Sequence, residues 1–379
     1  MIKKTVPLSS PDIGEEEVRA VEQVLRSSIL SIGPKVQEFE KLVSEYSGLR
    51  YCVAVNSGTS ALMLIMKAAG VTVGDRYLTT PFSFVTSSNI LLYEGAEPVF
   101  VDIDPLTFNM DVRQLEQRYA EDPAKETIKG IVGVDVFAQP LDWDPILDFT
   151  QKTGLKVIED SCEALGSSYK GKNCGSFGSA GAFAFYPNKQ MTTGEGGVVV
   201  TDDEEIYQLC RSMRNQGRGV AENWLEHVRL GYNFRMDELN AALGIEQVKK
   251  LDHFIVKRNA VAERYAMLFS GVNGVRTPVV ETYTTRISWF VYVVMLDEGI
   301  DRDGIIGYLQ ERGIQSRNYF APIHLQPFYK ERFGYREGML PITENVTKRT
   351  LAIPFYNNLT VEDQEYVVHT LKEGIERFS

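Results

Sequence analysis

The sequence has few cysteines and histidines, and neither residue type is spaced like a metal site. Among 379 residues there are four of each, and no CxxC pair occurs. Scattered cysteines of this kind are typical of reduced thiols in a cytosolic protein, so they argue against a disulfide framework or a zinc site. The four cysteines are Cys52, Cys162, Cys174 and Cys210.

Long apolar runs and an excess of positive charge are also missing. No apolar stretch is long enough to cross a bilayer and no signal-peptide pattern opens the sequence, so we expect a cytoplasmic protein. The formal net charge of −11 argues against a nucleic-acid-binding surface and favours small-molecule partners. The chain is long enough for two domains, which we expect at residues 1–255 and 256–379.

Strand and helix patterns alternate over the first 200 residues. This alternation predicts an α/β fold, in which a mostly parallel central sheet is covered by helices on both faces. The strands are expected at 51–55, 77–80, 98–103, 130–136, 156–158, 180–186 and 198–201, with helices at 11–27, 36–46, 61–69, 85–93, 111–119 and 145–153.

The C-terminal part has a different pattern, typical of a smaller α+β domain. A long helix is expected over residues 238–268, with its apolar residues on one face. Strands are expected at 287–296 and 315–320, separated by a helix over 302–313. The last helix begins at Thr360, a residue type that caps helices.

The segment from 155 to 201 carries the clearest chemical signal. A short apolar strand ends in Glu159 and Asp160, which places a carboxylate at the carboxyl end of a strand, where open α/β sheets bind their ligands. Lys189 follows in a loop after Pro187. Pyridoxal phosphate needs a lysine amine for its Schiff base and an acid facing its pyridine nitrogen. Either residue alone would be an ordinary structural one, and their joint placement is what indicates this cofactor.

A phosphate site is predicted near the start of the chain. The strand over 51–55 runs into small residues, including Gly58 and Thr59, and then into a helix. The free amides and the positive end of the helix dipole meet at this point and favour a phosphate. Gly58 would allow close backbone approach, and Thr59 would add a hydroxyl hydrogen bond. An ordinary helix cap is the structural alternative.

Four motifs in order resemble the signature of the nucleotide-sugar aminotransferases of the DegT/StrS type, which are fold-type I pyridoxal-phosphate enzymes. They are NSGTSAL (56–62), EDSCEALG (159–166), FAFYPNKQMTTGEGG (183–197) and LGYNFRMDELNAALG (230–244). The resemblance covers most of residues 10–260 and more weakly the remainder. It implies that Lys189 forms the Schiff base with the cofactor and that Asp160 faces the pyridinium nitrogen.

The resemblance also implies further cofactor contacts. Phe84 takes the position of the residue that stacks on the cofactor ring, and Asn233 that of a residue reaching the partner subunit's phosphate in a homodimer. Glu163 stands where the family usually has Gln or His facing the phenolic oxygen, so its partner is in doubt. Ala184 stands where a serine often helps hold the phosphate. By residue type alone, Phe84 would be a core aromatic and Asn233 a turn residue.

Substrate contacts follow from the same resemblance. The loop that carries Ile32 tends to lie over the substrate mouth, and the segment around His324 resembles the sugar-facing segment. By residue type alone, both are simply loop residues. The substrate-binding residues implied in this way are Ile32, Tyr186, Arg235, Tyr319 and His324.

The expected activity is transfer of an amino group from L-glutamate to a keto carbon of a nucleotide-linked sugar. Related sugar 3-dehydrases replace the lysine with His, whereas Lys189 is retained here. The stretch from Trp224 to Gly244, together with Glu163, looks most like perosamine synthases, so we expect C4 of a 4-keto-6-deoxy sugar. The alternatives are C3 amination, an aminohydroxybenzoate-synthase-like dehydratase, and a catalytically idle regulator. No helix-turn-helix or basic extension supports the regulator.

Overall fold

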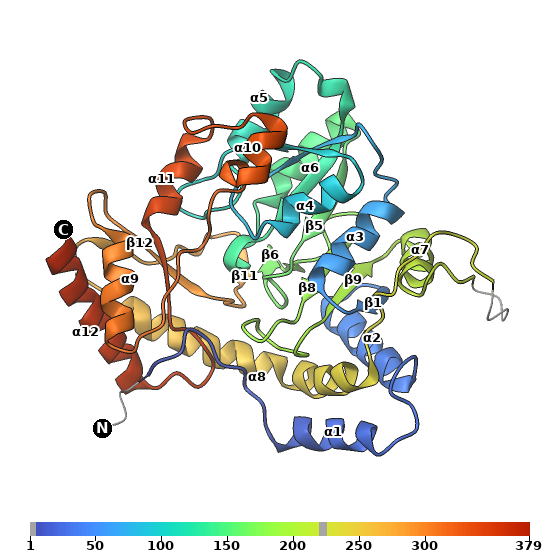
Figure 1. The fold of residues 1–379 in the computed structure, drawn as a ribbon, viewed down its shortest axis with the longest axis horizontal. Helices are drawn as coiled ribbons and strands as arrows, with labels where there is room; N and C mark the ends of the chain where they lie inside the picture. The colour runs from blue at the N-terminus through green and yellow to red at the C-terminus, as the bar shows by residue number, and fades with distance from the viewer. Residues whose placement is uncertain (1–4, 220–225) are drawn as a thin grey trace.

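A seven-stranded sheet forms the centre of the molecule (Figure 1). The computed structural model describes residues 5–219 and 226–379. The strand order is β1-β9-β8-β5-β4-β2-β3, and β9 runs in the opposite direction to the other six strands. These strands are β1 Tyr51–Val55, β2 Arg76–Thr79, β3 Glu97–Phe100, β4 Ile128–Val134, β5 Lys156–Asp160, β8 Gly181–Ala184 and β9 Gly197–Thr201.

Helices cover both faces of this sheet, as the alternation of side chains along β1 illustrates. Val53 and Val55 pack in a cluster with α3 and α7, whereas Cys52 and Ala54 pack with α2 and α8 on the other face. Successive strand residues point to opposite faces, so a strand buried on both sides is apolar throughout. The predicted α/β class is therefore confirmed. The helices here are α2 Pro34–Ser47, α3 Gly58–Ala68, α4 Thr86–Tyr93, α5 Val112–Ala120, α6 Trp143–Thr153 and α7 Glu204–Arg214.

The long helix α8, Glu238–Leu268, runs across the lower part of the molecule in Figure 1. It contacts α2 and, at the other side, α12, and α1 packs beneath it. The predicted domain boundary after residue 255 falls inside α8, so that division stays a prediction. No helix among the described residues has the length and apolar character needed to cross a membrane.

The C-terminal part is built on a second, antiparallel sheet of three strands in the order β10-β12-β13. Its core is an apolar cluster to which α8, α9 and α12 contribute. A third small sheet joins β11 to β6 and β7. The remaining elements are α1 Glu15–Leu25, β6 Ser168–Tyr169, β7 Lys172–Asn173, β10 Val275–Arg276, β11 Thr284–Arg286, β12 Tyr292–Leu296, α9 Arg302–Glu311, α10 Pro327–Phe333, α11 Pro341–Arg349, β13 Thr350–Ile353 and α12 Val361–Phe378.

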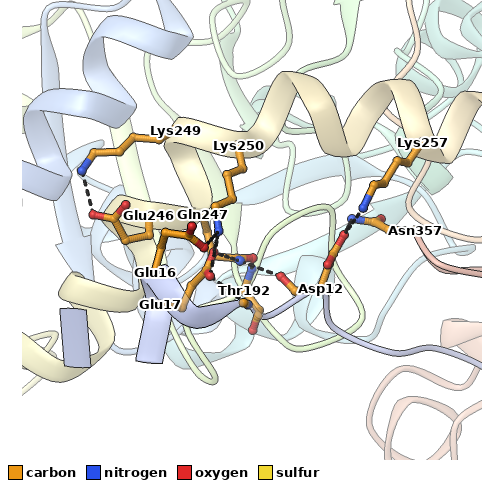
Figure 2. Close-up of polar contacts among 11 residues, drawn as sticks. Asp12, Glu16, Glu17, Thr192, Glu246, Gln247, Lys249, Lys250, Lys257 and Asn357 are labelled. Carbon is orange, nitrogen blue, oxygen red and sulfur yellow. Dashed lines mark hydrogen bonds and ion pairs between the residues drawn. The ribbon is translucent and has the colours of Figure 1, made fainter. Parts of the chain in front are cut away.

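The first helix begins later than its sequence predicts. Helix α1 starts at Glu15 with Gly14 as its cap, because the Gly14 N–H donates to the Glu17 carboxylate at 2.9 Å. Glu17 is buried beneath α8, where it also accepts from Lys250 and Gln247 (Figure 2). A contact with a distant helix, which no local pattern encodes, therefore sets the start of α1.

Two predicted strands in the C-terminal part also differ. The strand expected from residue 287 begins at Tyr292, because the backbone carbonyls of residues 288–290 accept hydrogen bonds from side chains instead of from a neighbouring strand. The strand expected at 315–320 does not form. Within that segment Arg317 makes an isolated bridge to Ala352, on the strand β13 that already pairs with β12.

Candidate active site

A cavity of about 590 Å³ opens at the carboxyl ends of β4 and β5. This is the edge at which open α/β sheets bind ligands. Its walls combine the first turn of α3, the ends of three strands, the loop that carries Lys189, and residues of the C-terminal part. The lining includes Ser57, Gly58, Thr59, Ser83, Phe84, Thr86, Ser87, Val134, Asp160, Cys162, Glu163, Ala184, Tyr186, Asn188, Lys189, Phe290, Asn318, Tyr319 and Phe320.

Lys189 lies in a turn after β8, where its N–H donates to the Tyr186 carbonyl at 2.9 Å. Its side chain is only 12% exposed, and its Nζ is 3.6 Å from Oε1 of Glu163. The same Nζ lies 3.8 Å from the centre of the Phe290 ring. The amine is therefore held between a carboxylate and an aromatic face, inside the cavity.

Asp160 ends β5 and is buried in the cavity wall. Its Oδ2 accepts from the Ser87 hydroxyl at 2.6 Å, and its Oδ1 accepts from the Cys162 N–H at 3.2 Å. Ser87 in turn lies 2.8 Å from the Ser83 hydroxyl, one helical turn earlier. Sequence reasoning missed both serines, since nothing local connects α4 to a strand end 73 positions later; the one available signal was the i, i+4 spacing of the serines.

Glu163 is held by the loop over residues 136–140. Its Oε2 accepts from the Phe137 N–H at 2.9 Å. Phe137 has a φ of 56°, a left-handed conformation uncommon for such a residue, and this turns its amide toward the carboxyl. Burial raises the pKa of the Glu163 carboxyl, and the nearby Lys189 amine opposes that rise. Glu163 is thus a buried acid whose charge depends on what the amine beside it carries.

The predicted strand, turn and helix near the start of the chain are present. The Ser57 side chain caps α3 by accepting from the Ser60 N–H. Gly58 has no room for a side chain, because a Cβ there would lie 2.7 Å from the Ala184 Cβ and 3.0 Å from the Cys162 sulfur. The Thr59 hydroxyl is 3.5 Å from the hydroxyl of Thr86. The first-turn amides of a helix have no intrahelical acceptor, so this corner of the cavity offers donors to an anion.

The remaining predicted residues fall into two groups. Phe84, Tyr186 and Tyr319 line the cavity with Lys189. Ile32 and Arg235 instead line a second hollow of about 600 Å³ beside α2 and α7. Arg235 donates there to Asn215 at 2.9 Å. The exposed Asn233 makes an isolated bridge to the same residue. Within this chain, these three residues do not meet Lys189. Trp224 and Leu225, which contributed to the perosamine-synthase resemblance, lie outside the described residues.

His324 does not line either hollow. Its side chain is fully buried, and its Nε2 lies 3.1 Å from the Glu344 carboxylate. The rings of Phe100 and Tyr335, which contact each other, both lie next to it. Burial lowers the pKa of His324, although Glu344 opposes this. Within this chain His324 therefore lies in the core, apart from the cavity that holds Lys189, and its predicted substrate role stays a prediction.

The lining of the cavity fits pyridoxal phosphate. One cavity holds a lysine amine, a strand-end carboxylate fixed by a hydroxyl, and the free amides at the start of α3, where Gly58 has no room for a Cβ. The Oδ1 of Asn188, next to the lysine, is buried and has no hydrogen-bond partner in the part of the chain that the structure describes. A buried acceptor without a donor is costly, so it indicates that a polar ligand completes the site. Lys189, Asp160 and the start of α3 would hold the aldehyde, ring nitrogen and phosphate ends of this cofactor.

Comparisons with known proteins agree with this geometry. The model of the DegT/DnrJ/EryC1/StrS aminotransferase family matches residues 11–372. The spore coat polysaccharide biosynthesis protein SpsC of Bacillus subtilis is 39% identical over 97% of this chain and 96% of its own length. GDP-perosamine synthase of Escherichia coli O157:H7 is 32% identical over 98% of both chains.

A solved structure agrees at the level of the whole fold. Helicobacter pylori PseC, an aminotransferase involved in the biosynthesis of pseudoaminic acid, superposes with a TM-score of 0.93 at 29% identity, covering 99% of this chain and 100% of that one. The match includes both the central sheet and the C-terminal part. With the family model spanning nearly every residue and a cavity built around Lys189, this chain belongs to the DegT/DnrJ/EryC1/StrS aminotransferase family.

Proposed function

We propose that this chain is a pyridoxal-phosphate-dependent aminotransferase that moves an amino group from L-glutamate to a keto carbon of a nucleotide-linked sugar. The observation that carries the proposal is the meeting of Lys189, Asp160 and the α3 amino terminus in one cavity. The names of relatives support the acceptor class, since one is a GDP-perosamine synthase and another a polysaccharide biosynthesis protein.

The cofactor, when bound, supplies an aldehyde that bonds to amines and a ring that withdraws electrons. Lys189 would bond to that aldehyde at rest and, once displaced by the substrate amine, take and return a proton through its Nζ. Asp160, fixed by the Ser87 hydroxyl, would hold a proton on the ring nitrogen. Asn318, Tyr319 and Phe320 also line the cavity, where they would orient the acceptor and limit the entry of water.

We further propose that the sugar is a 4-keto-6-deoxy sugar aminated at C4. The support is the presence of Glu163 beside Lys189 and the 32% identity to a GDP-perosamine synthase. C3 amination and a dehydratase reaction on the same fold are the competing outcomes. Incubating the holoenzyme with glutamate and a panel of nucleotide 3-keto and 4-keto sugars, with products identified by mass and NMR, distinguishes the three. An amine at C3, or loss of water without amination, would refute the C4 assignment.

The lysine assignment has its own test. Borohydride reduction of the holoenzyme should attach the cofactor permanently to the peptide that contains Lys189, as read by mass spectrometry. Lys189→Ala should lose this label and the visible absorbance band. Lys152→Ala is the matched control, because Lys152 is 70% exposed on α6 and should leave both unchanged. A label on another lysine in the wild type would reject the proposal.

We also propose that the enzyme works as a homodimer with shared sites. Ile32, Asn233 and Arg235 lie outside the Lys189 cavity of their own chain, and in the shared arrangement they would serve the partner's site. Mixing inactive Lys189→Ala with impaired Asn233→Ala should restore about a quarter of wild-type activity, because each heterodimer then has one intact site. No recovery after verified subunit exchange would contradict the shared site.

A further inference from the structure

Arg258 on α8 is a buried cation that contacts the backbone of Lys189. Its side chain is 3% exposed. One terminal nitrogen donates to the Lys189 carbonyl at 2.8 Å. The other donates to the carbonyls of Trp289 and Phe290 at 3.2 and 3.1 Å. A single guanidinium thus joins the lysine loop to a segment 100 positions later in the chain.

This arrangement is costly for the fold. Among the described residues, the hydrogen-bond acceptors of Arg258 are backbone carbonyls, and its buried Nε has none. Burial lowers the pKa of Arg258 to about 10, and Asp12 acts on it only through its charge. A buried charge without a paired carboxylate destabilises a protein unless its hydrogen bonds are needed. An apolar residue would therefore be expected here if packing alone mattered.

The segment from Ser288 to Phe290, which Arg258 contacts, is also held by a second side chain. The Gln190 amide donates to the carbonyls of Ser288 and Glu163, both at 2.6 Å. Three successive carbonyls, from Ser288 to Phe290, therefore accept from the side chains of Gln190 and Arg258. These bonds hold the Phe290 ring 3.8 Å from the Lys189 Nζ. Arg258 thus bonds to the backbone of the lysine, and Arg258 and Gln190 together hold the segment that carries the ring under its amine.

We propose that Arg258 is a positioning residue for Lys189, which holds the amine where it can bond to the cofactor aldehyde. The inference rests on the proposed function, since it assumes that Lys189 makes that bond. Arg258 fixes the lysine backbone on one side and the Phe290 ring on the other, so the Nζ is confined between that ring and Glu163. Without the guanidinium, both loops gain freedom, and the reactive geometry becomes one of several.

The test separates formation of the covalent bond between Lys189 and the cofactor aldehyde from non-covalent binding in the cavity. Pyridoxamine phosphate carries an amine in place of the aldehyde and cannot bond to a lysine, so its affinity reports the cavity alone. In Arg258→Met, we expect the visible band to form about tenfold more slowly when pyridoxal phosphate is added to apoenzyme. The Kd for pyridoxamine phosphate should stay within about twofold of wild type. Added guanidinium should accelerate band formation in Arg258→Ala.

Arg264→Met is the matched control. Arg264 lies on the same helix and donates to Gln364 at 2.6 Å, away from the cavity, so this variant should behave as wild type in both measurements. If Arg258→Met does not fold, the same measurements are made on Arg258→Lys, which keeps the positive charge but loses the planar set of N–H donors. Slower band formation in Arg258→Lys than in wild type supports the inference.

Two results would overturn the proposal. One is that the folded Arg258 variant, Met or Lys, forms the visible band as fast as wild type. The other is a loss of pyridoxamine phosphate affinity as large as the loss of rate, which indicates general damage to the cavity. Absence of the band in wild-type protein itself would instead refute the proposed function.

Discussion

The two acids at the end of β5, Glu159 and Asp160, are adjacent in sequence but have different surroundings. Asp160 faces the cavity, where Ser87 and Cys162 each donate one hydrogen bond to it. Glu159 faces the other side of the sheet and is fully buried. Strand residues alternate between faces, so one position along the chain separates a carboxylate open to a ligand from one enclosed by protein.

The interior acid is part of a small hydrogen-bonded group. Oε1 of Glu159 lies 2.8 Å from the Ser161 hydroxyl, which also lies 2.6 Å from Oδ2 of Asp135. A hydroxyl has one proton to donate, so both contacts are hydrogen bonds only if one of the carboxyls is protonated. Burial, followed by repulsion from Asp135, raises the pKa of Glu159 well above its ordinary value. The geometry and the raised pKa therefore both favour one proton shared between Asp135 and Glu159.

This contrast shows that the face of the strand, more than the type of residue, determines what an acid does. The acid on the cavity side keeps its acceptor oxygens available to a ligand. The acid on the interior side has them taken by the Ser161 hydroxyl and by the N–H groups of Gly175 and Phe177. Four substitutions test the contrast, from the largest expected effect to the smallest.

Asp160→Asn should lower turnover about a thousandfold, since the neutral amide cannot hold a proton on the cofactor ring. The cofactor should stay bound, because its phosphate and aldehyde contacts are untouched. Steady-state kinetics and the absorbance of the purified variant check both points. Turnover within tenfold of wild type would mean that another group faces the ring nitrogen, and the contrast between the two acids would fail.

Glu159→Ala should reduce the free energy of unfolding by about 3 kcal/mol, since it leaves the amides of Gly175 and Phe177 without their acceptor and Asp135 without its proton partner. Urea unfolding monitored by circular dichroism measures this. A change below about 1 kcal/mol would show that water or neighbouring groups replace the carboxyl, and that Glu159 is not the structural acid described.

Glu159→Gln should change how stability depends on pH. Glu159 keeps its proton in the folded chain at pH values where the unfolded chain, with an ordinary carboxyl pKa near 4.5, has lost it. The folded state then binds the extra proton, so wild-type stability falls relative to the variant as pH rises from about 4.5 toward the raised pKa. The slope approaches about 1.4 kcal/mol per pH unit for one proton. Parallel stability curves for the two proteins would contradict the shared proton.

Ser87→Ala should have the smallest effect, because it removes one of two donors to Asp160. A lost hydrogen bond of about 1 kcal/mol corresponds to roughly a fivefold drop in turnover. Ser47→Ala, which removes a hydroxyl that donates to the Ser44 carbonyl on α2, serves as a control and should leave turnover unchanged. An effect of Ser87→Ala as large as that of Asp160→Asn would mean that the hydroxyl itself contacts the reacting groups.

Much of the fold follows from local patterns. The strand predicted at 51–55 and the helix predicted at 238–268 have the same bounds as β1 and α8. Patterns failed where side chains replaced the expected partners. The strand predicted from residue 287 begins five residues later, since Arg258 and Gln190 take the carbonyls that a neighbouring strand would have used. The first helix starts at Glu15 because Glu17 is held under α8.

The residues of the candidate site also fall into those that the sequence predicts and those that it does not. Lys189, Asp160 and Gly58 are recognisable from their motifs, because each lies at a strand end or turn whose sequence encodes the local geometry. Ser87 and Phe290 have no such signal. Each reaches the cavity from a distant segment, and residue type alone does not indicate what a serine or a phenylalanine will face.

Sequence by itself determined the alternation of strands and helices, the glycine at the start of α3 and the pairing of a strand-end acid with a loop lysine, because these depend on neighbours a few residues apart. Tertiary structure decided which face of β5 received Glu159, that Ser87 reached Asp160, and that Arg258 held the carbonyl of Lys189. Those contacts join residues more than 65 positions apart. Hydrogen bonds over such separations form only after the elements have packed, and no local periodicity records them.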